Sequence, residues 1–577
     1  MRVVCLLLPL FLAPSFVDLK KGYDEAVKAR DWKSVKLAAQ SLAALKTDVA
    51  ARFLQQQLQF AREEAHQRAV FEAFAFMEFP GIEEFLDGQV NSNDPFRRAM
   101  SVKALARRDK QRGLRLASNL LELDDDARAR RIAVDVLAEI GDAAAASALM
   151  RHAPPLPVAE QLRITRALKG FPESALLGAR PMLRDGDPDV RLFAALAILA
   201  RPSPAFLTEI TNSFQNERDA RVRLILAATL DKLQGGTATG AATLRKAISK
   251  AKKFGQRYEI YDLIARAQLS DDAIVQHLTK TALSGDKRIR PKAAETLGYA
   301  GGAAAVPTLA KLLRQPRPWQ VSIGAARGLA ATRSRTAIEP LIKALGKAKG
   351  RHAWELSKAL ESLTGQPFGE AADVWARWWK ERGAGFQVQG LPDALWEEET
   401  AGEDKYSFYG IRIRSQAVTF VCDKSGSMQG NKLKTLQSEL LRILDRTPPS
   451  AKIRFIFFSN DKVLDAVPKT RLGTATKKLK KTGRARIEGL LAGGATNIWM
   501  ALQGAMKDPD VDTIVLLSDG APTAGKVRQP AQIRKRIREQ NRERMILFHM
   551  IAIGHTAPHF RDLARESGGT YVRKDVR

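Results

Sequence analysis

Cysteine is nearly absent from this chain, whose 577 residues include only Cys5 and Cys422. Cys5 lies in an apolar leader, so removal of that leader would leave Cys422 alone and exclude a disulfide within the mature chain. Cys422 stands in an apolar run beside Asp423, where a lone cysteine is more often part of a core than a redox group. The sequence therefore predicts a fold without internal disulfide bonds.

Long apolar runs and catalytic motifs are also lacking. After the leader, no stretch reaches the ~18 uninterrupted apolar residues of a membrane helix. The chain has no GxxxxGK[ST] phosphate loop, no Ser or Cys elbow motif and no carboxylate dyad. His549, His555 and His559 lie near one another in the sequence, but His549 sits in an apolar run typical of a core. We therefore expect a non-enzymatic protein; a metallohydrolase would require turnover that Asp423→Ala abolishes.

Acidic residues are too few to balance the basic ones, and the net charge is +30. Residues 402–577 carry 33 Lys and Arg against 17 Asp and Glu, so about half of the excess lies there. Such a field favours anionic partners, including acidic proteins and anionic surfaces. No nucleic-acid motif accompanies it, and the basic run between Lys477 and Arg486 is most often a solvated helix face.

The first 15 residues look like a short signal peptide. Arg2 precedes an apolar run from Val3 to Leu12, and the small residues Ala13 and Ser15 would mark cleavage before Phe16. A buried first helix is the alternative. We expect a secreted, periplasmic or cell-envelope protein, or a cytoplasmic one if the leader is not a signal peptide.

Helical periodicity dominates the first two thirds of the chain. Residues 16–93 are rich in Ala, Leu, Lys and Glu, which favours antiparallel helices. From 94 to 383 a pattern recurs in units of about 30 residues, as in DPFRRAMSVKAL, DPDVRLFAALAIL and DKRIRPKAAETL. An acidic residue such as Asp187 or Asp286 stands where each helix would be capped, followed by arginine and a stripe of Ala and Leu.

These paired helices resemble HEAT repeats, which implies an all-α solenoid. A helical bundle without repeats is the alternative. Trp375, Trp378 and Trp379 on the last helix would seal the end of the array. Residues 384–414 are rich in Gly and acidic residues and show no periodicity, so we expect a linker there.

Strand and helix patterns alternate over residues 415–577. The apolar runs IRFIFFS, TIVLLSD and ILFHMIAIG are separated by helical runs, and TYVRK would add a short strand at the edge. Alternating βαβ units predict a doubly wound, Rossmann-like α/β domain with a parallel sheet. Ligands of such sheets bind outside the carboxyl ends of the strands.

Oxygen-bearing side chains follow these expected strands. Asp423, Ser425 and Ser427 come directly after the apolar run Val418 to Cys422, and two later loops, GGATN and LLSDG, offer Thr496 and Asp519. Hydroxyls and carboxylates are hard donors that suit Mg²⁺, Mn²⁺ or Ca²⁺ rather than zinc. The alternative is an ordinary polar turn between a strand and a helix.

The motifs DKSGSM, GGATN and LLSDG, in this order, resemble the metal-ion-dependent adhesion site of von Willebrand factor A (VWA) domains. The resemblance implies that Ser425 and Ser427 bind the metal directly and that Thr496 binds it directly or through water. Asp423 and Asp519 would act mainly through waters. It further implies an open coordination position, which a carboxylate of a protein partner would fill, with Mg²⁺ as the expected cation.

The resulting hypothesis is a scaffolding protein in which helical repeats hold partners and a metal-dependent domain binds an acidic residue of a target. The alternative is a chelatase-like or co-chaperone subunit that works with a separate AAA-type ATPase, because the chain has no phosphate loop of its own.

Cleavage of the leader is directly testable. We expect the protein isolated from its native host to begin near Phe16 and to fractionate outside the cytosol. Amino-terminal sequencing by mass spectrometry measures this. A chain that retains Met1 and fractionates with the cytosol would contradict export.

Overall fold

The computed structural model describes residues 15–575 except 62, 125, 154–157, 236–238, 315–317, 389–405, 461–464 and 555–556. The chain forms two compact units, Met1–Thr243 and Leu244–Arg577, which are described separately. The leader, apart from Ser15, and most of the expected linker lie outside the described residues. Within the described part of the chain, no helix is long and apolar enough to cross a membrane.

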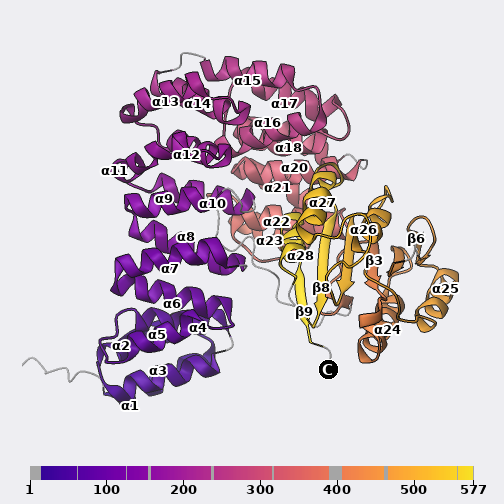
Figure 1. The fold of residues 1–577 in the computed structure, drawn as a ribbon, viewed down its shortest axis with the longest axis horizontal. Helices are drawn as coiled ribbons and strands as arrows, with labels where there is room; N and C mark the ends of the chain where they lie inside the picture. Colours follow the sequence, from indigo (N-terminus) through magenta and orange to yellow (C-terminus); the bar gives the residue numbers. More distant parts are fainter. Residues whose placement is uncertain are drawn as a thin grey trace, which may run out of the picture. The chain divides into compact units, whose positions relative to one another are not determined.

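All the secondary-structure elements described in the first unit are helices, as the periodicity predicts (Figure 1). Its α-helices are α1 (Phe16–Ala29), α2 (Trp32–Ala44), α3 (Asp48–Phe60), α4 (Glu64–Phe74), α5 (Ile82–Val90), α6 (Pro95–Arg108), α7 (Lys110–Leu123), α8 (Ala127–Ile140), α9 (Ala143–His152), α10 (Val158–Lys169), α11 (Glu173–Leu176), α12 (Pro188–Ala200), α13 (Leu207–Asn216) and α14 (Ala220–Leu233). Two 3₁₀ segments, η1 (Leu177–Arg184) and η2 (Pro204–Phe206), join α11 to α12 and α12 to α13. The helix α15 (Thr239–Lys250) spans the boundary between the units.

Aspartates cap the helices that open the repeats. Asp94 Oδ1 accepts from the backbone N–H of Phe96 at 2.9 Å, and Asp187 Oδ1 accepts from that of Asp189 at 2.8 Å. Both helices have proline in their first turn, where the missing N–H costs nothing. The predicted N-cap role of Asp187 is confirmed.

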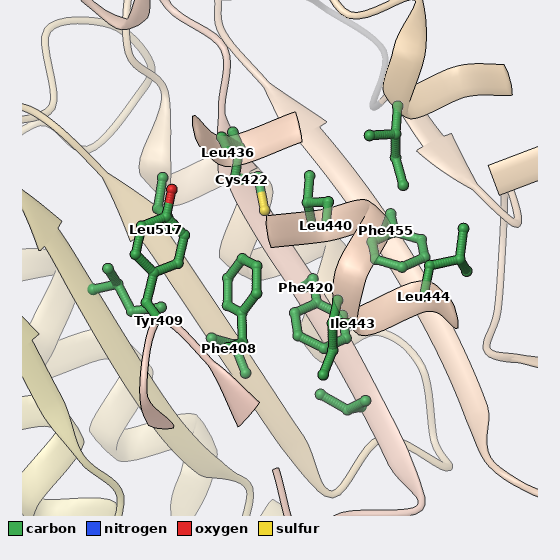
Figure 2. Packing of buried hydrophobic residues seen from close by; sticks show 14 of the residues in the cluster. Phe408, Tyr409, Phe420, Cys422, Leu436, Leu440, Ile443, Leu444, Phe455 and Leu517 are labelled. Carbon is green, nitrogen blue, oxygen red and sulfur yellow. The ribbon is translucent and has the colours of Figure 1, made fainter. Parts of the chain in front are cut away.

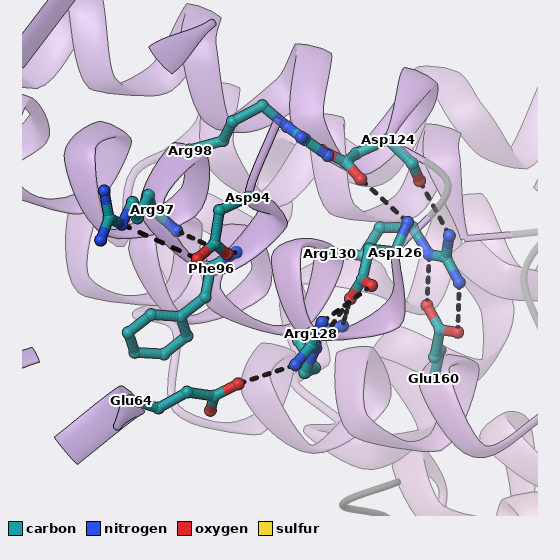
Figure 3. Close-up of polar contacts among 10 residues, drawn as sticks. All are labelled: Glu64, Asp94, Phe96, Arg97, Arg98, Asp124, Asp126, Arg128, Arg130 and Glu160. Atoms are coloured by element: carbon teal, nitrogen blue, oxygen red, sulfur yellow. Dashed lines mark hydrogen bonds and ion pairs between the residues drawn. The ribbon is translucent and has the colours of Figure 1, made fainter. Parts of the chain in front are cut away.

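Arginines on these helices link one repeat to the next (Figure 3). Arg98 donates through Nε and Nη2 to Asp124 Oδ2 at 2.9 and 2.8 Å, and Arg130 makes a bidentate pair with Glu160 at 2.6 Å. Arg191 repeats the arrangement with Glu217, at 2.8 and 3.0 Å. A planar guanidinium matches a carboxylate in this bidentate geometry, so the arginine of the sequence pattern serves to join neighbouring repeats.

The second unit begins with more helices of the same kind. They are α16 (Phe254–Ala267), α17 (Asp272–Ser284), α18 (Arg290–Gly301), η3 (Gly302–Ala305), α19 (Val306–Leu313), α20 (Trp319–Ala331), η4 (Arg335–Ala337), α21 (Ile338–Leu345), α22 (Arg351–Thr364) and α23 (Ala372–Arg382). A Cβ on Gly298 of α18 would collide with the carbonyl oxygen of Gly328 on α20. Glycine therefore allows these two helix backbones to touch.

Asp286 takes the predicted capping position, because its Oδ1 accepts from the N–H of Arg288 at 3.0 Å and its carbonyl oxygen accepts from the N–H of Arg290 at 3.1 Å. The continuous helix α18 nevertheless begins only at Arg290, with Ile289 at its N-cap. The reason is Pro291, which has no N–H and cannot bond to the carbonyl of Lys287. Regular helical bonding is therefore interrupted after Asp286 and continues from Ile289, whose carbonyl accepts from the N–H of Ala293 at 2.9 Å.

Trp375 seals the last helix, as expected. Its side chain is fully buried, its indole donates to the carbonyl of Gly369 at 2.8 Å, and Phe368 packs edge-on against it at 4.9 Å between ring centroids. Trp378 and Trp379 are only half-buried and pack against Phe386.

A parallel sheet follows in the second unit. Its strands are β3 (Ala417–Asp423), β4 (Lys452–Phe458), β7 (Thr513–Ser518), β8 (Leu547–Ile553) and β9 (Tyr571–Lys574), all parallel to their neighbours in the order β4-β3-β7-β8-β9. The expected edge strand at TYVRK is confirmed. Two short antiparallel strands that were not predicted, β5 (Asp465–Val467) and β6 (Gly473–Thr474), pair with β4.

Helices cover both faces of this sheet, so the doubly wound architecture is confirmed. On one face, α24 (Asn431–Arg446) and α25 (Lys477–Glu488) pack on Phe420, Cys422 and Phe455 (Figure 2). On the other, α26 (Ile498–Met506), α27 (Pro530–Arg544) and α28 (Pro558–Ser567) pack on a second cluster that includes Val421. Cys422 is buried and unpaired, as its apolar surroundings predict.

The residues before β3 form a hairpin. Here β1 (Ser407–Phe408) and β2 (Ile411–Arg412) pair with each other in a separate two-stranded sheet, and Phe408 packs on Phe420 at 5.1 Å between ring centroids. The linker that the sequence predicts over residues 384–414 therefore contains this hairpin near its end.

A buried arginine joins the helices of the second unit to its sheet. Arg351, the first residue of α22, donates to the carbonyl oxygen of Asp512 at 2.6 Å, one residue before β7 begins. Its guanidinium also lies over the ring of Trp319 at 5.1 Å and pairs with Glu355 at 3.2 Å. Glu355 supplies the opposite charge that a guanidinium buried this deeply requires, although the Nε of Arg351 has no hydrogen-bond partner.

Loss of an inter-repeat ion pair should destabilise the chain. Glu217→Gln removes the charge that Arg191 binds, and we expect it to lower the free energy of unfolding by about 1–2 kcal/mol. Asp24→Asn, at an exposed pair with Lys20, serves as the control and should cost less than about 0.5 kcal/mol. Urea denaturation of the full chain measures both, and equal effects would contradict the assignment.

The Glu217 effect should also depend on pH. Arg191 hydrogen bonds hold the pKa of Glu217 below its usual value of 4.5. A carboxyl whose pKa is lower in the folded than in the unfolded chain stabilises the fold at pH values above its unfolded-state pKa. This stabilisation is lost as the pH falls through its folded-state pKa. The difference between wild type and Glu217→Gln should therefore shrink below pH 4.5.

Candidate functional site

The five predicted oxygen-bearing residues lie at the carboxyl edge of the sheet, at the end of β3 or in nearby loops. Asp423 is the last residue of β3, and Asp519 directly follows β7. These two strands are neighbours, with Cys422 paired to Leu517, so parallel pairing alone brings the two aspartates together. The turn Gly426–Met428 is 3₁₀ and carries Ser427 on its outer side, where it is exposed.

The Asp423 carboxylate is buried and hydrogen-bonded. Its Oδ1 accepts from the N–H of Ser425 at 2.8 Å, and its Oδ2 accepts from the hydroxyl of Ser518 at 2.6 Å. Burial is the main cause that raises the pKa of this carboxyl, and the nearby Asp519 raises it further. Removal of a carboxylate from water disfavours its ionised form.

A continuous chain of oxygens runs from Ser425 to Asp519. The hydroxyls of Ser425 and Ser427 lie 3.1 Å apart, and the Ser427 hydroxyl donates to Asp519 Oδ1 at 2.7 Å. The contact between Ser427 and Asp519 joins residues 92 positions apart in the sequence. The structure therefore brings the DKSGSM and LLSDG loops together as the motifs predict.

The loop that carries Thr496 is tied to the same edge through its backbone. Gly426 N–H donates to the carbonyl of Gly494 at 2.9 Å, and Gly493 N–H donates to that of Lys424 at 2.8 Å. Thr496 is buried, and its N–H donates to the hydroxyl of Thr523 at 2.9 Å. The third loop is thus held beside the other two.

Two polar residues of the site were not predicted. Ser518 supplies a hydrogen bond to Asp423, and Lys432 places Nζ 2.6 Å from Asp519 Oδ2 and 3.2 Å from the carbonyl oxygen of Ser427. Ser518 stands inside the LLSDG motif, and Lys432 follows Ser427 by five residues at the start of α24. Both residues lie within or next to the motifs in the sequence, but the sequence does not show that their side chains point toward Asp423 and Asp519.

The arrangement fits a divalent cation. Three hydroxyls and two carboxylates supply hard oxygens, and a bound cation would offset the cost of burying the Asp423 carboxylate. Among the described residues, no group of three or more His, Cys, Asp or Glu side chains could hold a metal ion. A centre here would therefore depend on serine and threonine oxygens.

The two described histidines near the carboxyl terminus, His549 and His559, lie on different elements. His549 is buried in β8, and its Nδ1 accepts from the N–H of Thr570 at 3.1 Å, as expected for a core histidine. His559 lies on α28, and His555 lies outside the described residues. The basic run forms α25, where Arg484 pairs with Asp445 and Arg486 with Asp465, while its lysines at 477, 478 and 481 are exposed.

Comparison with known families agrees with this geometry. Residues 416–573 match the family model described as von Willebrand factor type A domain. Residues 323–347 match the one described as PBS lyase HEAT-like repeat. The chain thus contains a VWA domain of doubly wound α/β fold, preceded by a helical region with a HEAT-like repeat, and both predicted resemblances are confirmed.

Curated relatives share only part of the chain. Inter-alpha-trypsin inhibitor heavy chain H4 of Homo sapiens is 31% identical over 151 residues, which are 24% of this chain and 16% of that protein. The Bos taurus protein of the same name is 34% identical over 134 residues, 21% of this chain and 14% of that protein. The chain therefore spans about a sixth of the length of these relatives.

Solved structures give two kinds of similarity. A von Willebrand factor type A protein from Catenulispora acidiphila is 19% identical, with a TM-score of 0.25, and the match covers 28% of this chain and 40% of that one. Human deoxyhypusine hydroxylase is 17% identical, with a TM-score of 0.24, over 48% of this chain and 99% of that one. We draw no conclusion from TM-scores of this size.

The environment of His549 yields a testable titration. Burial, together with the positive charges of Arg351 and Arg414, lowers the pKa of His549 from 6.5 to about 3. We expect its ring resonances in an NMR titration to stay constant between pH 8 and pH 5, because the ring remains neutral. A midpoint near pH 6.5 would contradict the buried position and reopen a proton-transfer role.

Proposed function

We propose that this chain is a non-enzymatic protein-binding scaffold whose VWA domain holds an acidic residue of a partner through a divalent cation. Mg²⁺ is the expected cation, with Mn²⁺ or Ca²⁺ as substitutes. The observation that carries the proposal is the run of oxygens from Ser425 through Ser427 to Asp519, with Asp423 buried behind it. The VWA match supports protein interaction as the role of this domain.

The residues of the site would contact the cation in different ways. Ser425 and Ser427 would bind the cation directly, Thr496 directly or through water, and Asp423 and Asp519 mainly through waters. The short hydrogen bonds of Asp423 to Ser425 N–H and to the Ser518 hydroxyl fix the carboxylate, so that it presents its charge to the site without rearrangement. The cation supplies a Lewis-acid position that an incoming carboxylate can occupy.

Charge explains why a partner carboxylate would complete the site. Serine and threonine hydroxyls are neutral, so the direct ligands leave the double positive charge of the cation largely unbalanced. The exposed Ser427 shows that the site opens to solvent, and an acidic partner residue can therefore reach the metal. Metal and partner should each strengthen the binding of the other.

The rest of the chain suits a scaffold. The helical repeats offer an extended surface for further partners, and the excess of 30 positive charges favours anionic ones. A secreted or cell-envelope location would follow from the leader.

The metal claim is tested by substitution. Asp423→Asn should weaken Mg²⁺ or Mn²⁺ binding by about 10–100-fold, and Ser427→Ala should weaken it as well because a direct ligand is lost. Gln429→Ala, an exposed residue of the same loop, is the matched control. Isothermal titration calorimetry on the full chain measures the affinities.

A cross-linking pull-down with and without EDTA then tests the partner. We expect EDTA and Asp423→Asn to remove the same partner, while Gln429→Ala retains it. No heat with millimolar metal, together with capture that EDTA does not change, would contradict the proposal. Recovery of an AAA-type ATPase as the main partner would instead favour the chelatase-like or co-chaperone role.

A further inference from the structure

Each carboxylate oxygen of Asp519 accepts a hydrogen bond from another side chain of the protein. Its Oδ1 accepts from the Ser427 hydroxyl at 2.7 Å, and its Oδ2 accepts from Lys432 Nζ at 2.6 Å. The side chain of Asp519 is 0% exposed, and the 9% exposure of the whole residue comes from its main chain. The ammonium is therefore the cation that this buried carboxylate holds in the described arrangement.

Lys432 also reaches a second oxygen of the site. Its Nζ donates to the carbonyl oxygen of Ser427 at 3.2 Å, so one ammonium bridges the DKSGSM loop and the LLSDG loop. A divalent cation bound among Ser425, Ser427 and Asp519 would serve the same two loops. The Lys432 ammonium and a divalent metal ion would therefore compete for the negative charge of Asp519.

The position of Lys432 is not explained by the stability of its helix. It is the second residue of α24, whose first turn contains no acidic residue. A lysine at a helix amino terminus is repelled by the helix dipole. The ion pair with Asp519 compensates for this unfavourable place, which points to the site rather than the helix as the reason for the lysine.

We propose that Lys432 is a tethered cation that competes with the divalent metal for Asp519 and so keeps the metal affinity of the partner-free domain low. This inference rests on the proposed function. On metal binding the ammonium leaves Asp519 for solvent, which its 32% exposed side chain and flexible stem allow. It then lies at the rim of the site, where it pairs with an acidic partner.

The test compares Lys432→Met with wild type by isothermal titration calorimetry of the full chain with Mg²⁺ or Mn²⁺ alone. Methionine retains an unbranched stem without charge, so we expect metal affinity to rise at least about fivefold as a competing charge is removed. Lys434→Met, an exposed lysine in the same helix, is the matched control and should leave affinity unchanged. Lys432→Arg should stay close to wild type because the charge is kept.

A second readout follows the lysine itself. Saturating Mg²⁺ should increase labelling of the Lys432 amine by an amine-reactive ester, measured by mass spectrometry, whereas labelling of Lys434 should not change. Circular dichroism of each variant confirms that it is folded. Neither measurement depends on a known partner.

The outcomes separate the two proposals. Tighter metal binding by Lys432→Met, including binding that wild type fails to show, supports competition. Equal or weaker binding by Lys432→Met, with wild type still binding metal, overturns the role of Lys432 and leaves the proposed function standing. Absence of metal binding in wild type and in Lys432→Met overturns both.

Discussion

Parallel pairing of β3 with β7 is the constraint on which the candidate site depends. Strand β7 begins about 90 residues after β3 ends, yet the ladder from Val418 to Cys422 fixes both strands in one register. Parallel strands place their carboxyl ends at the same edge. The DKSGSM and LLSDG loops therefore emerge at one place, and backbone hydrogen bonds tie the Thr496 loop to the first of them. A shift in this register would separate Asp423 from Ser518 before it affected any loop.

The buried carboxylates of the candidate site lower the stability of this edge of the sheet. Asp423 is buried with two hydrogen-bond donors, and Asp519 is buried beside Lys432. Removal of carboxylates from water is unfavourable, and two neighbouring ones repel each other. Natural sites commonly retain such strain because activity requires it. The surrounding strands, with their large apolar clusters on both faces, supply the stability that the site itself does not.

Much of this architecture could be predicted from the sequence, because it follows from local patterns. Periodicity located the helices, apolar runs located the long parallel strands, and the motif spacing located Asp423, Ser425, Ser427, Thr496 and Asp519. Whether those five residues bind metal stays a prediction. Short strands such as β5 and β6 were missed because two or three residues carry no period.

The remaining differences have local or tertiary causes. The continuous helix α18 begins only at Arg290, one turn after the predicted cap at Asp286, because Pro291 lacks a backbone donor. Lys432 and Ser518 were missed because side-chain direction depends on packing that no spacing reveals. The same holds for Arg351, which the repeat pattern marks as an ordinary helix residue although it binds the carbonyl of Asp512.

The position of that arginine has a mechanical consequence. Arg351 binds the carbonyl oxygen of Asp512, one residue before β7, and Asp519 lies one residue after the end of β7. A pull between the last helices and a ligand at the carboxyl edge would therefore run lengthwise along β7, over roughly 20 Å. Lengthwise tension loads the ladders to β3 and β8 in shear, so their hydrogen bonds resist together instead of opening one after another.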